Sequence, residues 1–206
     1  MATTARKMDS QASQQGLPLK VELKPVIQLN DDEFFEFCQI NRDLRIERNA
    51  RGELLLMPPT GAETGDRNAE ITTQLRIWAK GEGTGISFDS STGFSLPNSA
   101  VRSPDASWVR KSRYAILSAE QRKKFVHLCP DFVLELRSPS DELTVLQAKM
   151  QEYLDNGARL GWLIDSEAKR VYVYRPQTPV NCLEGVDSLS GDPVLSGFVL
   201  RLREIW

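Results

Sequence analysis

The run from Asp131 to Arg137, Asp-Phe-Val-Leu-Glu-Leu-Arg, constrains the fold of this chain more than any other segment. Successive side chains of a β-strand point to opposite faces, and here apolar residues stand at both odd and even positions. Such a strand is buried on both faces, as in a sheet that helices cover on two sides. Glu135 interrupts the apolar run, and a buried carboxylate costs several kcal/mol unless a cation or hydrogen-bond donors compensate its charge.

The segments around this strand predict an α/β fold with a mixed central β-sheet flanked by helices. Thr60 and Glu63 have the spacing of a capping box, and Ser138 with Pro139 resembles a helix start. We expect helices over residues 31–39, 60–80, 118–124 and 138–156, strands over 53–57, 86–88, 93–96, 105–110, 131–137, 162–165 and 170–174, and a loop carrying a short strand over 176–193.

Composition is that of a soluble globular protein, with 40% hydrophobic and 26% charged residues among 206. Residues 1–16 are polar and predict a disordered tail, which leaves a single domain over residues 17–206. No apolar run is long enough to cross a bilayer. The cysteines, Cys38, Cys129 and Cys182, are odd in number and far apart, which favours a reducing, cytoplasmic compartment over a disulfide framework or a zinc site.

Two aspartates follow prolines and are candidates to share a cation with Glu135. Asp131 lies on the same strand as Glu135, about 13 Å away, which is too far to bind one ion. Asp105 begins a different strand, and neighbouring strands lie about 5 Å apart. The sequence therefore predicts that Asp105 and Glu135 form a metal site, whereas Asp131 is a strand-edge or turn residue.

Lys149 lies on the helix expected after Glu135. On a helical wheel it stands about 40° from Tyr153, at the edge of the apolar stripe, so its ammonium can reach the sheet. The alternative is a surface lysine that pairs with Glu152. Glu70 flanks the apolar stripe of the first long helix and is either a further site residue or an ordinary solvated glutamate.

A basic tract brackets Asp105. Between Val101 and Lys124 there are seven basic residues and two acidic ones, although the whole chain carries a net charge of −2. Arg110, Lys111 and Arg113 could hold a nucleic-acid backbone without reading its sequence. The alternative is a solvated loop and helix face.

Other chemistries fit the sequence less well. A carboxylate pair also serves glycoside hydrolysis, but that reaction leaves Lys149 and the basic tract unexplained. Nothing places His127, the only histidine, beside a cysteine or in a catalytic triad. The chain contains neither a phosphate-binding loop of the Gly-x-x-x-x-Gly-Lys-Ser/Thr type nor a dinucleotide-binding glycine motif.

Several motifs together resemble the PD-(D/E)XK, or restriction-endonuclease-like, superfamily. Within it, the chain is most similar to the large bacterial family described as putative restriction endonucleases. The matching stretches are Met57–Gly61, Ser90–Phe94, Arg102–Asp105, Pro130–Ser140, Lys149–Tyr153 and Gly161–Asp165.

This resemblance implies a metal-dependent endodeoxyribonuclease in which Asp105 and Glu135 bind Mg²⁺, or Mn²⁺ in its place, with the Leu136 carbonyl as a further ligand. The superfamily lysine usually stands two residues after the glutamate, where this chain has Arg137. The resemblance implies that Lys149 takes that role, and that Glu70 matches an acidic residue of the first core helix.

The resemblance also leaves alternatives for the substrate and the assembly. The chain is an endonuclease acting on DNA, an endonuclease acting on RNA or structured DNA, or an inactive descendant that binds nucleic acid or protein. Arg137 motivates the last of these. A homodimer is expected by analogy, because cutting both strands of a duplex commonly uses two active sites.

Overall fold

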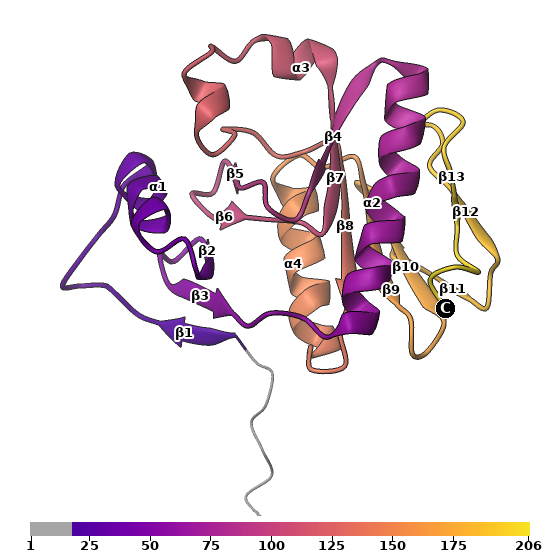
Figure 1. Ribbon diagram of the computed structural model, residues 1–206, viewed down its shortest axis with the longest axis horizontal. Coiled ribbons are helices and arrows are strands. Elements are labelled where there is room, and N and C mark those ends of the chain that lie inside the picture. Colours follow the sequence, from indigo (N-terminus) through magenta and orange to yellow (C-terminus); the bar gives the residue numbers. More distant parts are fainter. Residues whose placement is uncertain (1–17) are drawn as a thin grey trace, which may run out of the picture.

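The computed structural model describes residues 18–206 (Figure 1). A six-stranded sheet, here called the large sheet, has the strand order β11-β10-β9-β8-β7-β4. Its strands are β4 (Gly85–Asp89), β7 (Ala106–Arg110), β8 (Phe132–Arg137), β9 (Leu160–Asp165), β10 (Arg170–Tyr174) and β11 (Asn181–Glu184). β8 and β9 pair in parallel and the other neighbours pair antiparallel, so the sheet is mixed, as the sequence predicts.

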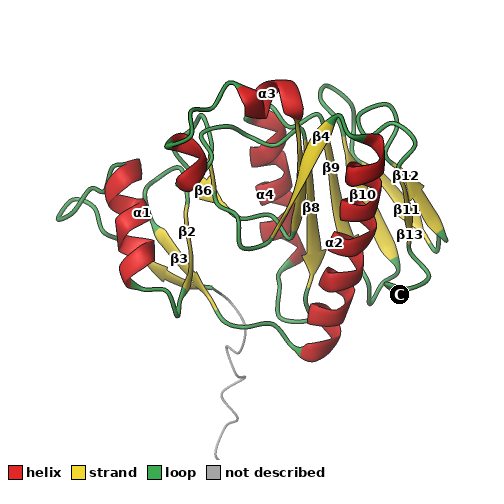
Figure 2. Ribbon diagram, turned by 45° about the horizontal axis from the view of Figure 1, so that its top comes forward, coloured by secondary structure: helices red, strands yellow, loops and turns green. Residues whose placement is uncertain are grey.

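Two helices cover the large sheet, one on each face (Figure 2). α2 (Ala62–Glu82) buries Ile71 and Leu75 against the face that includes Phe132. α4 (Leu143–Asp155) buries Met150 against the face that includes Val133. The two covered faces explain the apolar residues at both parities of β8.

A second sheet, here called the small sheet, has the strand order β1-β3-β2-β6-β5 and stands beside the large one (Figure 1). Its strands are β1 (Leu19–Val21), β2 (Arg45–Arg48), β3 (Leu54–Met57), β5 (Phe94–Ser95) and β6 (Val101–Arg102). α1 (Asp31–Ile40) packs on it through the buried ring of Phe34. A capping box between Asn30 and Glu33 begins this helix.

The remaining elements extend these layers. α3 (Lys111–Ala115) follows β7, and a short 3₁₀ helix, η1, spans Gln121–Lys123. The hairpin of β12 (Ser188–Ser190) and β13 (Val199–Arg201) lies against α2, where the side chain of Gln74 bonds both backbone groups of Arg201. The C-terminal segment packs on the core, since Ile205 is fully buried.

Two predicted helix starts are wrong. α2 begins after Gly61 without a side-chain cap, so Thr60 forms no capping box. α4 begins at Leu143, because Ser138 and Asp141 bond each other instead of starting a helix. The Ser138 hydroxyl donates to Oδ2 of Asp141 at 2.6 Å, and the Asp141 N–H donates to the Ser138 carbonyl at 3.0 Å. Short polar side chains commonly stabilise such turns at the expense of helix.

Other expectations need smaller corrections. The helix expected over 118–124 is limited to η1, and β1, β2, β6 and α3 were not predicted. The expected tail, residues 1–16, lies outside the described residues, and the single domain over 17–206 stays a prediction. Within residues 18–206, no helix has the length and apolar character that a membrane crossing requires.

Candidate active site

Asp105, directly before β7, and Glu135, on β8, lie opposite each other. β7 and β8 pair antiparallel with Ser107 opposite Val133 and Ala106 opposite Leu134. One further step of this register brings Asp105 opposite Glu135, on the face that α4 covers. Both carboxylates are withdrawn from solvent, and Glu135 is only 4% exposed.

Lys149 reaches this pair from α4. Its Nζ lies 2.9 Å from Oε1 of Glu135, and the hydroxyl of Tyr153 donates to the same oxygen at 2.9 Å. Lys149 is therefore no surface lysine paired with Glu152. That glutamate instead binds Arg102, with 2.7 Å between Oε2 and Nε.

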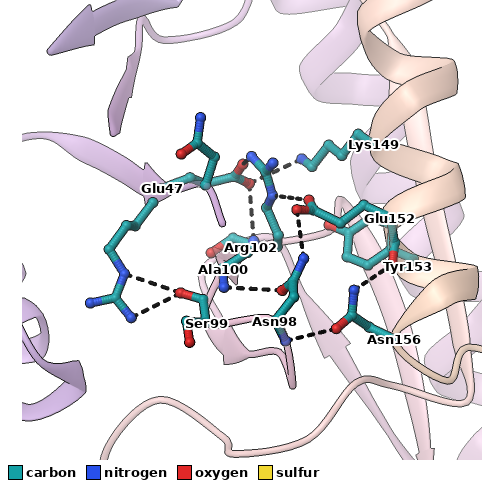
Figure 3. A network of polar contacts seen from close by, with 12 residues as sticks. Glu47, Asn98, Ser99, Ala100, Arg102, Lys149, Glu152, Tyr153 and Asn156 are labelled. Atoms are coloured by element: carbon teal, nitrogen blue, oxygen red, sulfur yellow. Dashed lines mark hydrogen bonds and ion pairs between the residues drawn. The ribbon is translucent and has the colours of Figure 1, made fainter. Parts of the chain in front are cut away.

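Glu47, on β2 of the small sheet, is a third buried carboxylate that sequence reasoning missed (Figure 3). Its Oε1 lies 3.0 Å from Nζ of Lys149 and accepts the N–H of Ser103 at 3.0 Å. Its Oε2 lies 3.0 Å from Nη1 of Arg102. The residues around Glu47, Arg-Ile-Glu-Arg, are too charged to predict a buried strand, so no pattern in the sequence marks this residue.

The electrostatics of the three carboxylates differ. Burial raises the pKa of Glu135, and the neighbouring charges of Asp105 and Glu47 add to the rise against the opposing effect of Lys149. Burial also raises the pKa of Asp105. Burial would do the same to Glu47, but Lys149 and Arg102 outweigh it and hold its pKa low. Glu47 is therefore the most firmly ionised of the three.

The group opens onto a cleft of about 1090 Å³ between the small sheet and the large one. Asp105, Glu135 and Lys149 line it, together with the turn from Ser138 to Asp141. On the opposite side the lining comes from the small sheet and its loops, including the basic residues Lys20, Arg45 and Arg51. Arg45 lies 3.5 Å from Oδ1 of Asp105. The carboxylate pair is thus accessible to a ligand of considerable size.

Of the basic tract, Arg102 lines this cleft, where it binds Glu47 and Glu152. Asp105 precedes the first residue of β7 and Arg110 is the last, about 16 Å further along the strand. Arg110, Lys111 and Arg113 are absent from the cleft lining. Arg113 instead forms an ion pair with buried Asp131 at 3.1 Å. Arg110, Lys111 and Arg113 therefore lie away from the carboxylate pair, and their contact with a nucleic-acid backbone stays a prediction.

Asp131 has a structural role. Its Oδ2 accepts the backbone N–H of Arg110 at 2.9 Å, in addition to the ion pair with Arg113. These contacts fix the end of β7 and the start of α3, in agreement with the prediction of a strand-edge residue.

Glu70 and Arg137 also lie outside the cleft lining. The Glu70 carboxylate accepts a hydrogen bond from the Gln74 side chain at 2.8 Å. Arg137 turns to Asp165, with 2.7 Å between Nη1 and Oδ2, and to the carbonyl of Asp141. The position that usually carries the lysine is therefore occupied by a side chain engaged in structural contacts.

The donor set fits a hard divalent cation. Asp105 and Glu135 offer carboxylate oxygens, the ligands that Mg²⁺ prefers, and burial raises the pKa of both groups, so a bound cation would favour their ionised forms. Among residues 18–206, no group of three or more His, Cys, Asp or Glu side chains could hold an ion together. One or two carboxylates with several waters are typical of Mg²⁺ sites.

The chain belongs to the family Uma2, described as "Putative restriction endonuclease", whose model matches residues 31–203. In fold it is similar to the crystal structure of a putative nuclease belonging to DUF820 from Anabaena variabilis, with a TM-score of 0.68 and 22% sequence identity. That similarity covers 86% of this chain and 97% of the other. No curated protein matches the chain. The restriction-endonuclease-like fold and family expected from the motifs are thus confirmed.

Proposed function

We propose that this protein is a Mg²⁺-dependent endonuclease that hydrolyses phosphodiester bonds in DNA. The observation that carries the proposal is the buried pair Asp105 and Glu135, with Lys149 beside it, on the wall of a cleft. Membership in a family described as restriction endonucleases supports the same reaction class. A cytoplasmic location and a homodimer remain predictions.

Asp105 and Glu135 would hold the ion. The Leu136 N–H donates to Oδ2 of Asp105 at 2.9 Å and so fixes one carboxylate in place. When bound, Mg²⁺ would polarise the scissile phosphate and lower the pKa of a water molecule. In the overall reaction, the water oxygen bonds to phosphorus, the P–O ester bond breaks, and the leaving oxygen gains a proton.

Lys149 supplies hydrogen bonds and positive charge. Burial disfavours its ammonium, but Glu135 and Glu47 outweigh burial and raise its pKa. The lysine is therefore a donor, suited to orienting the attacking water or to stabilising negative charge that develops on the phosphate. Proton acceptance by Lys149 would first require loss of a strongly held proton.

The test is cleavage of labelled duplex DNA, single-stranded DNA and RNA over a Mg²⁺ titration. We expect cleavage of DNA by the wild type and none by Asp105→Ala or Glu135→Ala, with all three proteins folded by circular dichroism. Activity that persists in both variants would remove the assignment. Cleavage of RNA alone would keep the site and change the substrate.

A second candidate is an inactive descendant that binds nucleic acid or protein, which the engagement of Arg137 with Asp165 favours. Mg²⁺ titration separates the two functions. A nuclease should gain thermal stability from Mg²⁺ through Asp105 and Glu135, whereas the binding protein should show no Mg²⁺-dependent gain.

A further inference from the structure

Glu47 joins the small sheet to the catalytic group of the large one. It lies on β2, whereas Lys149 lies on α4 and Glu135 on β8. The ammonium of Lys149 stands between two carboxylate oxygens, 3.0 Å from Glu47 and 2.9 Å from Glu135. Figure 3 shows Glu47 and Lys149 approaching each other from their separate elements.

The two carboxylates differ in what else holds them. Glu47 is fixed by Arg102 and by the N–H of Ser103, so both of its oxygens are already bonded. Glu135 has Lys149 and Tyr153 on one oxygen and belongs to the proposed metal pair. A cation bound there would compete with Lys149 for the charge of Glu135, because both are positive.

An ammonium that lost its partner here would be costly. The Lys149 side chain is only 12% exposed, and an unpaired buried charge is strongly destabilising. Glu47 offers a second partner whose own position does not depend on Glu135. Lys149 can therefore remain in the site when Glu135 neutralises a cation.

We propose that Glu47 is a positioning residue that retains the Lys149 ammonium while Glu135 binds the metal. This inference rests on the proposed function, since it concerns the same site. Glu47 is not a ligand: its oxygens are committed to Lys149, Arg102 and Ser103, and no metal-binding group of three such side chains exists among residues 18–206. Without Glu47, Lys149 would pair with Glu135 alone and oppose metal binding.

The test measures Mn²⁺ binding by calorimetry for the wild type, Glu47→Gln, Lys149→Met and the double variant. Glu47→Gln should weaken binding roughly tenfold or more, because Lys149 then competes fully for Glu135. In the Lys149→Met background the same substitution should change affinity less than about threefold. Glu47→Asp should restore most of the affinity. Glu152→Gln is the matched control, because it removes a carboxylate from Arg102 but none from Lys149.

The possible outcomes separate the inference from the proposed function. A wild type that binds no Mn²⁺ refutes the metal site and the inference with it. Two results refute the inference alone: Glu47→Gln leaves Mn²⁺ binding unchanged, or it weakens binding equally with Lys149 and with Met at position 149. Equal weakening would mean that Glu47 acts only as a general source of negative potential. If Glu47→Gln fails to fold, Glu47→Ala and Glu47→Ala/Lys149→Met provide the same comparison with a smaller neutral side chain. A loss of affinity in the first variant that vanishes in the second supports the inference, and equal loss or no loss overturns it.

Discussion

The backbone N–H of Leu136 donates a hydrogen bond to Oδ2 of Asp105 at 2.9 Å, which links two neighbouring strands at the proposed metal site. Leu136 follows Glu135, so the same short segment of β8 supplies one carboxylate and orients the other. Placement of Glu135 on β8 and of Asp105 directly before β7 gives a more rigid arrangement than long loops would. The relative position of the two carboxylates is therefore built into the pairing of β7 with β8.

The roles of Lys149 and Arg137 can be separated by substitution. Lys149→Met should reduce the single-turnover rate of DNA cleavage by about 10² or more, because it removes a charged donor from the site. Arg137→Met should reduce the rate far less and instead lower the melting temperature, because Arg137 pairs with buried Asp165. Rapid-quench kinetics and thermal unfolding of both variants check this. The opposite ranking of the two rates would assign the lysine role to Arg137.

The cleft predicts where DNA binds. Arg51→Ala should weaken DNA binding and reduce its salt dependence, since Arg51 lines the cleft. Lys111→Ala, which removes an equal charge near the far end of β7, should leave both almost unchanged. Fluorescence anisotropy over a range of salt concentrations, with Ca²⁺ in place of Mg²⁺, measures the two slopes. A larger effect of Lys111→Ala would move the DNA to the basic tract and away from the cleft.

Much of the large sheet follows from the sequence, because β8, β9 and β10 are apolar runs with clear ends. The choice of Asp105 as the partner of Glu135 could also be predicted from the sequence, because distance along a strand excludes Asp131. Glu47 and the cleft were not, because both depend on the packing of the small sheet against α4. The separation of Arg110, Lys111 and Arg113 from Asp105 has another cause, because the extended strand β7 lies between Asp105 and these three bases.

The thiols predict a chemical test of the fold. Burial raises the pKa of Cys129 to about 12 and that of Cys38 to about 11, so both are protonated at neutral pH. Cys182 is exposed. Iodoacetamide at pH 7.5 should label Cys182 first and Cys129 only after unfolding, as mass spectrometry of peptides can show. Rapid labelling of Cys129 in the folded protein would contradict the packing described between α4 and the large sheet.

Asp31 should shape the acid stability of the small sheet. Burial disfavours its charge, but hydrogen bonds from Ser95 and Arg48 outweigh burial and lower its pKa below the ordinary 3.8. Because the pKa is lower in the folded protein than in the unfolded chain, the ionised Asp31 stabilises the fold above pH 3.8. This stability is lost as the pH falls through the folded-state pKa. Asp31→Asn should therefore destabilise the protein at pH 6 and much less near pH 2. Urea unfolding across this pH range measures the change in the free energy of unfolding that Asp31→Asn causes. An equal loss at both pH values would contradict the stabilising role of the Asp31 charge.

The most direct test of the central claim is anomalous diffraction from crystals soaked with Mn²⁺. We predict a peak between the carboxylates of Asp105 and Glu135, with Lys149 still bonded to Glu47, and no such peak in crystals of Glu135→Gln. Crystals of the wild type at saturating Mn²⁺ that show no density there, with Lys149 still paired to Glu135, would contradict the assignment of this pair as a metal site.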